Sequence, residues 1–224
     1  MIKAVTFDLD MTLIDFLKLK KKSSDAAAKA MIKAGLKMHP DQCKKELFEH
    51  YMMDIEGDDV FTDFLKKCNQ YSERILAAGI NAYLKTKKNH LRPYPAVKKT
   101  LRKLKKKGIK LAIVTDAPRL KAYIRLDAMG IADLFDIVVG FEDTNKKKPN
   151  KLPFKKALEL LAIRPDEALH VGDWPERDIK GAKSLGMKTC LANYGYAVHN
   201  YGKYVEPDYK INRFEELLKI IDSP

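Results

Sequence analysis

The sequence has few cysteines and no long apolar run. Its three cysteines, Cys43, Cys68 and Cys190, are scattered and show no C-x-x-C spacing, which argues against a disulfide framework or a cysteine-based zinc site. No stretch approaches the ~20 consecutive apolar residues that a membrane-spanning helix requires. The opening MIKAVTFDLD reaches an acidic residue too early for the apolar part of a secretory signal. We therefore expect a cytoplasmic protein that does not enter a membrane.

Arginine is also scarce, although the chain is strongly basic. The formal net charge of +13 comes from 35 Lys and only 8 Arg. Base readout relies on Arg, Asn and Gln, and single-strand binding uses exposed aromatic rings. The lysines of 97–107 instead flank Val97, Leu101 and Leu104 at helical spacing, as on the solvent side of an amphipathic helix. The composition therefore predicts a lysine-rich surface without specific nucleic-acid binding, and it is typical of heat-adapted proteins.

Glycine and proline are sparse between residues 16 and 91, and runs of β-prone residues are absent there. Apolar residues recur at helical spacing, for example at Ala27 and Met31. We therefore expect an all-helical block over 16–91. Because this block follows the first strand of the chain, it is expected to form a cap domain inserted into a core of residues 1–15 and 92–224.

The remainder of the chain alternates between β-prone and helical segments. Such alternation with short links predicts an α/β fold, in which a doubly wound, mostly parallel sheet is covered by helices on both faces. The strands are expected at 2–7, 109–115, 137–139, 168–171, 189–191 and 209–211, and the helices at 94–107, 118–129, 154–161, 175–186 and around 214–221.

Two acidic residues follow the first predicted strand, in the sequence Asp8-Leu9-Asp10-Met11-Thr12. Residues at i and i+2 of an extended segment point to the same side, so the carboxylates of Asp8 and Asp10 are expected to converge. Ligands of open parallel sheets bind beyond the carboxyl ends of the strands, where this pair lies. A surface turn rich in aspartate is the ordinary explanation for the pair taken alone.

Three other segments bring polar side chains to predicted strand ends. Thr115 ends one strand, Asp173 ends another with Asp178 in the helix that follows, and Lys148 lies in Lys-Lys-Lys-Pro before an amphipathic helix. Each has an ordinary explanation by itself: a turn, a helix N-cap, a first-turn acid, and a solvated charge run.

Taken together, these segments predict one site at a single edge of the sheet. Like charges about 4 Å apart repel by roughly 4 kcal/mol at an effective dielectric of 20. Several carboxylates gathered there therefore need a compensating cation. Oxygen ligands with room for water and phosphate suit Mg²⁺, and such a site suits phosphoryl transfer.

The order of these motifs resembles the haloacid dehalogenase-like hydrolase superfamily, in particular its members with a helical cap after the first strand. The resemblance covers the whole chain and rests on D-x-D-x-T, a strand-terminal Thr, Lys-Pro, and G-D-x-x-x-x-D. It implies a Rossmann-like core and a phosphatase that forms an aspartyl-phosphate intermediate. Asp8 would be the nucleophile, and Asp10 the acid and base.

The resemblance also implies a ligand set and a phosphate cradle. Mg²⁺ would be held by Asp8, the backbone carbonyl of Asp10, and Asp173, with Asp178 beside the metal, directly or through water. Asp178 would also orient Lys148, which would offset charge on the nucleophile and on the transferred group. The phosphoryl oxygens would contact Thr115, Lys148 and the backbone at Asp116.

This sequence departs from the family pattern at three places, of which Lys151, in place of a usual proline, matters least. Met11 stands where glycine is usual, which would restrict the backbone turn, and Asp116 stands where asparagine is common, which adds an acid near the phosphate. His170 lies inside a predicted buried strand, where a packed core histidine is expected rather than a proton shuttle.

Other functions stay open from the sequence alone. A 2-haloacid dehalogenase of the same superfamily needs neither the metal nor an equivalent of Asp10, so the acids favour a phosphatase. A phosphonate hydrolase would need a cap lysine, and a phosphomutase uses the same motifs. A basic polyanion-binding protein is the alternative of another class. The expected substrates are small phosphorylated metabolites of the sugar or triose phosphate type, and the protein could be a monomer or a homodimer.

Overall fold

Residues 1–53, 59–195 and 205–222 are described by a computed structural model. They belong to two compact units, one containing Met1–Asp15 and Arg92–Pro224 and the other containing Phe16–Leu91. Within these described ranges, no helix is both long and apolar enough to cross a membrane.

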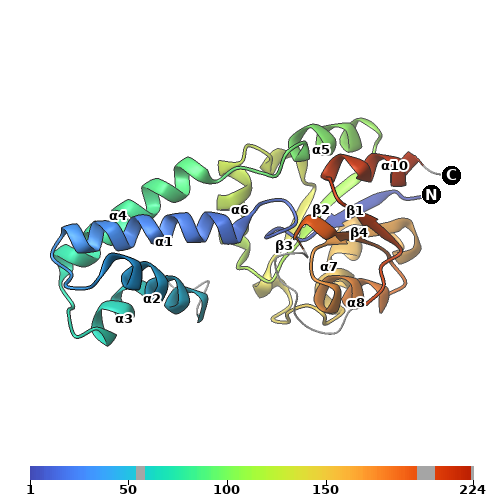
Figure 1. Cartoon of the computed structure of the whole chain (residues 1–224). Coiled ribbons are helices and arrows are strands. Elements are labelled where there is room, and N and C mark those ends of the chain that lie inside the picture. The colour runs from blue at the N-terminus through green and yellow to red at the C-terminus, as the bar shows by residue number, and fades with distance from the viewer. Residues whose placement is uncertain (54–58, 196–204, 223–224) are drawn as a thin grey trace. The chain divides into compact units, whose positions relative to one another are not determined.

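The first unit is built on a parallel sheet of six strands in the order β3-β2-β1-β4-β5-β6 (Figure 1). The strands are β1 (Ala4–Phe7), β2 (Lys110–Val114), β3 (Ile137–Val139), β4 (Ala168–Gly172), β5 (Lys188–Ala192) and β6 (Tyr209–Ile211). The chain leaves β1 toward β2 on one side and later returns to β4 on its other side, which creates a switch point where ligands bind in such sheets. The predicted doubly wound α/β fold is confirmed.

The central strands are apolar throughout because helices cover both faces of the sheet. All residues of β1 and β4 are buried. Figure 1 shows α5 (Val97–Lys106) and α10 (Leu217–Asp222) over one face, and α7 (Leu152–Leu161) and α8 (Lys180–Lys183) over the other. A further helix of this unit, α6 (Arg119–Ala128), follows β2.

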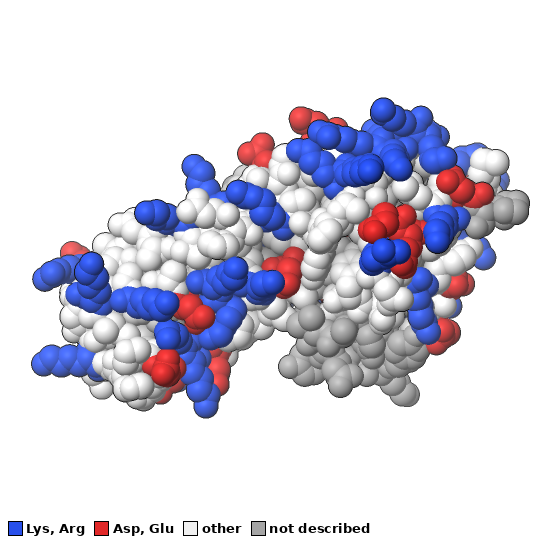
Figure 2. Space-filling view, turned by 45° about the horizontal axis from the view of Figure 1, so that its top comes forward, with Lys and Arg blue, Asp and Glu red and all other residues white. Residues whose placement is uncertain are grey.

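The lysine pattern of the sequence corresponds to the outer side of α5. Val97, Leu101 and Leu104 are buried, whereas Lys99 and Lys103 are exposed. Figure 2 shows Lys and Arg side chains spread over the visible surface, with acidic side chains among them. The basic charge therefore lies largely on solvent-facing positions.

The segment after β4 differs from its prediction. We expected one helix over 175–186, but the chain forms a single π-helical turn at Pro175–Ile179 (η4) and then the short α8. The Asp178 N–H donates to the Trp174 carbonyl at 2.7 Å, and the Trp174 N–H donates back to Asp178 Oδ2 at 3.0 Å. These reciprocal bonds hold the Asp178 side chain toward the end of β4, and the wider turn itself is closed by the Lys180 N–H, which donates to the Pro175 carbonyl five residues earlier.

The second unit consists, in its described residues, of four helices. They are α1 (Phe16–Lys33), α2 (Pro40–Met53), α3 (Val60–Lys67) and α4 (Glu73–His90). Its core contains Met31, Leu47, Phe64 and Leu65. α1 and α4 approach closely at Gly79, where an added Cβ would lie 2.2 Å from the end of the Met31 side chain.

Candidate active site

Three neighbouring strands carry polar residues to the same edge of the sheet. Asp8 directly follows β1, Thr115 follows β2, and Asp173 follows β4. The backbone continues the sheet pairing at two of these points, since the Asp8 N–H donates to Val171 O at 2.9 Å and the Thr115 N–H donates to Val139 O at 3.0 Å. Parallel strands thus bring together residues that are far apart in the sequence.

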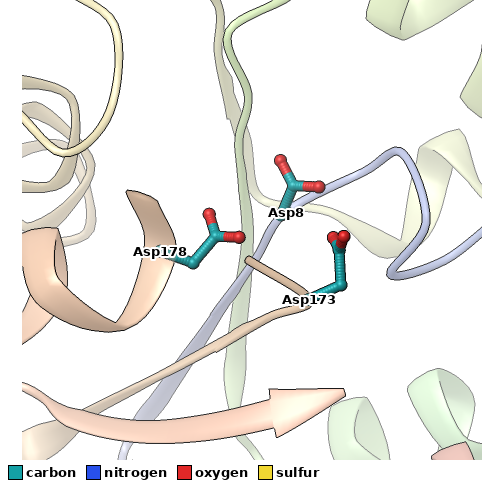
Figure 3. A group of neighbouring side chains, drawn as sticks. All are labelled: Asp8, Asp173 and Asp178. Carbon is teal, nitrogen blue, oxygen red and sulfur yellow. The ribbon is translucent and has the colours of Figure 1, made fainter. Parts of the chain in front are cut away.

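Three carboxylates form a buried cluster at this edge. One oxygen each from Asp8, Asp173 and Asp178 lies within 4.8 Å of the others. Figure 3 shows the three side chains pointing toward a common centre. An added Cβ at Gly172 would lie 2.4 Å from the Cβ of Asp178, so the glycine makes room for this acid. Oxygen atoms at this spacing could hold a metal ion.

Lys148 lies inside this cluster. Its Nζ donates to Asp8 Oδ1, and to Asp178 Oδ1 at 2.6 Å. Its side chain is only 4% exposed. A buried ammonium needs such partners, because an isolated charge in a protein interior is costly. The lysine therefore connects the acid after β1 with the acid of η4, as the sequence suggested for Lys148 and Asp178.

Asp173 accepts a hydrogen bond from a threonine hydroxyl group, and a tyrosine supports that threonine. Thr12 Oγ1 donates to Asp173 Oδ1 at 2.9 Å, and Tyr194 OH donates to the backbone carbonyl of Thr12 at 2.8 Å. The Thr12 side chain is fully buried. The threonine of D-x-D-x-T therefore orients an acid that lies 161 residues away.

The three acids have different proton affinities. Burial raises the pKa of Asp8 to about 7, with Lys148 opposing this rise and Asp178 adding to it. Burial, with Asp8 as a charged neighbour, also raises the pKa of Asp173. Burial by itself would also raise the pKa of Asp178, but Lys148 and His170 hold this pKa below its usual range. The Asp178–Lys148 pair is thus ionised, while Asp8 and Asp173 repel each other.

His170 supports this arrangement from within β4. Its Nδ1 lies 2.8 Å from Thr6 Oγ1 and its Nε2 lies 3.5 Å from Asp178 Oδ1. Phe154 packs against the ring edge to face, with centroids 4.9 Å apart. Burial lowers the pKa of His170. It is the packed core histidine that we expected, but its contact with Asp178 was not foreseen.

Asp116 anchors the loop that carries Lys148. Its Oδ1 accepts from the Lys148 backbone N–H at 2.9 Å, and its Oδ2 lies 2.7 Å from Arg177 Nη2. The Arg177 guanidinium also lies over the Trp174 ring, 4.8 Å from its centroid. The acid that replaces the usual asparagine is therefore balanced by an arginine. Next to it, Thr115 is buried and its Oγ1 accepts from the Ala117 N–H at 3.2 Å.

Asp10 directly precedes a tight turn and contacts a residue that we did not foresee. Met11 adopts φ 64°, so the left-handed turn forms although glycine is absent. Asp10 Oδ2 accepts from Arg125 Nη1 at 2.9 Å. The side chain of Arg125 is 3% exposed. One signal was available in the sequence: Arg125 occupies an apolar-face position of α6, between Ala122 and Leu126.

The sequence model of the haloacid dehalogenase-like hydrolase family matches residues 5–192. The chain is 35% identical to a glyceraldehyde 3-phosphate phosphatase of Pyrococcus furiosus, over 99% of this chain and 93% of the relative. It is 32% identical to a phosphoglycolate phosphatase of Aquifex aeolicus, over 99% and 97%. A predicted phosphoglycolate phosphatase from Haemophilus somnus has a similar crystal structure, with a TM-score of 0.68, 27% identity, and coverage of 99% of this chain and 98% of the other.

Proposed function

This chain belongs to the haloacid dehalogenase-like hydrolase family, and we propose that it is a Mg²⁺-dependent phosphatase of small phosphate monoesters. The observation that carries the proposal is the buried Asp8 carboxylate, which lies between Lys148 and two further acids. A carboxylate held in this way suits nucleophilic attack on phosphorus. The similarity to named phosphatases over nearly the whole chain supports the same reaction.

The acid cluster fits a divalent cation. Lys148 balances one of the three carboxylates, and the pKa values of Asp8 and Asp173 are raised because the remaining negative charge is buried. Oxygen ligands of this kind are those that Mg²⁺ prefers. Asp8, Asp173 and Asp178, together with the Asp10 carbonyl, would hold the ion. When bound, it would offset negative charge on the phosphoryl oxygens.

We assign the proton and bond changes to two residues. A carboxylate oxygen of Asp8 attacks phosphorus, and the bond from phosphorus to the leaving oxygen breaks. Asp10 gives its proton to that oxygen, which leaves as an alcohol. Water then attacks the aspartyl-phosphate, and Asp10 takes a proton from it. Inorganic phosphate departs and the Asp8 carboxylate is restored.

We assign the binding of the phosphoryl group to residues around the nucleophile. The Thr115 hydroxyl and the backbone N–H groups near Asp116 would donate to its oxygens. Lys148 would place its positive charge beside both Asp8 and the transferred group. Asp116 has a second role, since it fixes the backbone from which Lys148 extends.

The proposed substrates are phosphorylated two- or three-carbon metabolites. The relatives are named for glyceraldehyde 3-phosphate and phosphoglycolate, which are both small phosphate esters. We propose that the helical unit Phe16–Leu91 serves as a cap that limits substrate size and excludes water during the reaction.

The purified protein is expected to release phosphate from at least one such ester and from p-nitrophenyl phosphate when Mg²⁺ is present. EDTA should stop turnover, and added Mg²⁺ should restore it. Phosphate release measured over a panel of metabolites tests the proposal. Turnover without a divalent ion, combined with halide release from a 2-haloacid, would instead support a dehalogenase. Transfer of phosphate within a sugar would support a mutase.

The metal-free protein is expected to lose stability as the pH rises from about 4 to about 7. Asp8 and Asp173 have raised pKa values, so the folded chain binds their protons more tightly than the unfolded chain does, and ionising them costs stability. Asp178 has a lowered pKa, so its opposite effect is confined to more acidic pH. Thermal melting should therefore show a lower midpoint at about pH 7.5 than at about pH 5. Mg²⁺ should raise the midpoint more at the higher pH, and an equal Mg²⁺ effect at both pH values would contradict this reasoning.

A further inference from the structure

Arg125 is a buried cation to which the proposed reaction assigns no role. It extends from α6, the helix after β2, where Ala122, Arg125 and Leu126 form the buried side. Its exposed neighbours on the same helix include Tyr123 and Ile124. An arginine at a core position costs free energy unless it is paired, because its charge must be removed from water. The sequence thus has a charged group at a buried position of α6 where an apolar side chain would pack at a lower cost in free energy.

The charge is directed at Asp10. Arg125 Nη1 donates to Asp10 Oδ2 at 2.9 Å, and the two side chains are 3% and 24% exposed. The contact joins residues 115 positions apart, and both belong to the same compact unit. A guanidinium is planar and rigid, so a bond from it fixes the direction of a carboxylate more strongly than a flexible ammonium does.

We propose that Arg125 is a positioning residue, which holds the Asp10 carboxyl group in the orientation needed for proton transfer to the leaving oxygen. The inference rests on the proposed function, since it assigns Arg125 a role in that reaction. Arg125 itself contacts neither phosphorus nor the nucleophile in this role. It acts through Asp10, because proton transfer requires the carboxyl group within hydrogen-bonding distance of the leaving oxygen.

A purely structural role for Arg125 would have a different signature. If the pair only anchored α6 to the loop after β1, its loss would disturb every substrate alike. Loss of the Asp10 orientation would instead lower kcat/KM only for substrates whose leaving group needs a proton, because the later attack of water does not enter kcat/KM. The alkoxide of glycerol is a poor leaving group and needs one, whereas p-nitrophenolate is a stable anion and departs without it.

The test compares kcat/KM of Arg125→Met for glycerol 3-phosphate and p-nitrophenyl phosphate, because kcat/KM reports the steps up to departure of the leaving group. We expect a fall of roughly 10- to 100-fold for glycerol 3-phosphate, as for a misplaced catalytic group. The fall for p-nitrophenyl phosphate should stay below about threefold. Arg119→Met is the matched control, since it removes the same charge from the same helix at a side chain that is 48% exposed, and it should change neither value.

A second comparison tests whether Arg125 acts on the reaction through Asp10. In an Asp10→Asn background, Arg125→Met should cause no further loss with glycerol 3-phosphate, because the group that it positions is already removed. If Arg125→Met does not fold, Arg125→Lys serves for the same substrate comparison, with a smaller loss of the same selectivity. Equal losses on both substrates, or additive losses with Asp10→Asn, would overturn the inference. Failure of the wild-type protein to hydrolyse either substrate would overturn the proposed function instead.

Discussion

Asp8→Asn is expected to abolish turnover of p-nitrophenyl phosphate, with a loss of more than about 10⁴-fold in kcat, as for other covalent nucleophiles. The amide has nearly the same shape as the carboxylate but cannot form the aspartyl-phosphate. Burial already disfavours the charged form of Asp8, so a neutral side chain should leave the melting temperature nearly unchanged. Steady-state kinetics and thermal melting measure the two effects separately.

Asp133→Asn provides the control for this variant. It is the same chemical change at an exposed residue of the turn Ala132–Leu134, and we expect wild-type kinetics from it. A wild-type rate in Asp8→Asn would show that Asp8 is not the nucleophile. If Asp8→Asn loses both activity and folding, the Asp8→Glu variant tests the assignment instead. That longer carboxylate should fold and still turn over at a strongly reduced rate, because its oxygens are displaced from the phosphorus.

Lys148→Met should lower both activity and stability. The substitution removes the cation between Asp8 and Asp178, and removing one partner of a buried ion pair typically costs about 3–5 kcal/mol. The two acids can take up protons in response, so the loss of stability should be smaller near pH 5 than near pH 8. The loss in kcat should be on the order of 10²- to 10³-fold, because a cation that stabilises transferred charge is gone.

Lys146→Met is a closely matched control, since it removes the same charge two residues earlier at an exposed position. Substitutions at such surface sites usually change stability by less than about 0.5 kcal/mol. Denaturant unfolding of both variants, followed by kinetics on the folded samples, makes the comparison. Similar behaviour of the two variants would mean that the buried position of Lys148 is unimportant.

The position of the site could be predicted because its acids lie next to strands with a strong sequence signal. The buried runs before Asp8 and Asp173 identify two strands that lie side by side in the sheet. Once the sheet is parallel, the residues after these strands must meet at one edge. The location of Asp8 relative to Asp173 thus follows from local patterns and a rule of topology.

The supporting contacts could not be predicted in this way. The bond from Arg125 to Asp10 and the ion pair between Arg177 and Asp116 depend on side-chain directions set by packing. No spacing of residues in the sequence predicts either of these two contacts. The π-helical turn at Pro175–Ile179 was missed for a related reason: its sequence suits an ordinary helix, and no local pattern predicts the bond from the Lys180 N–H to the Pro175 carbonyl that widens the turn.

Gly172 leaves a volume beside β4 that the side chain of Asp178 occupies. Even one methyl group at this position would overlap Asp178, since its Cβ would lie 2.4 Å from the Cβ of that acid. Displacing Asp178 would deprive Lys148 of one of its two anionic partners and leave it drawn to Asp8 alone. A residue without a side chain, which touches no reacting atom, thereby allows Lys148 to be shared between Asp8 and Asp178.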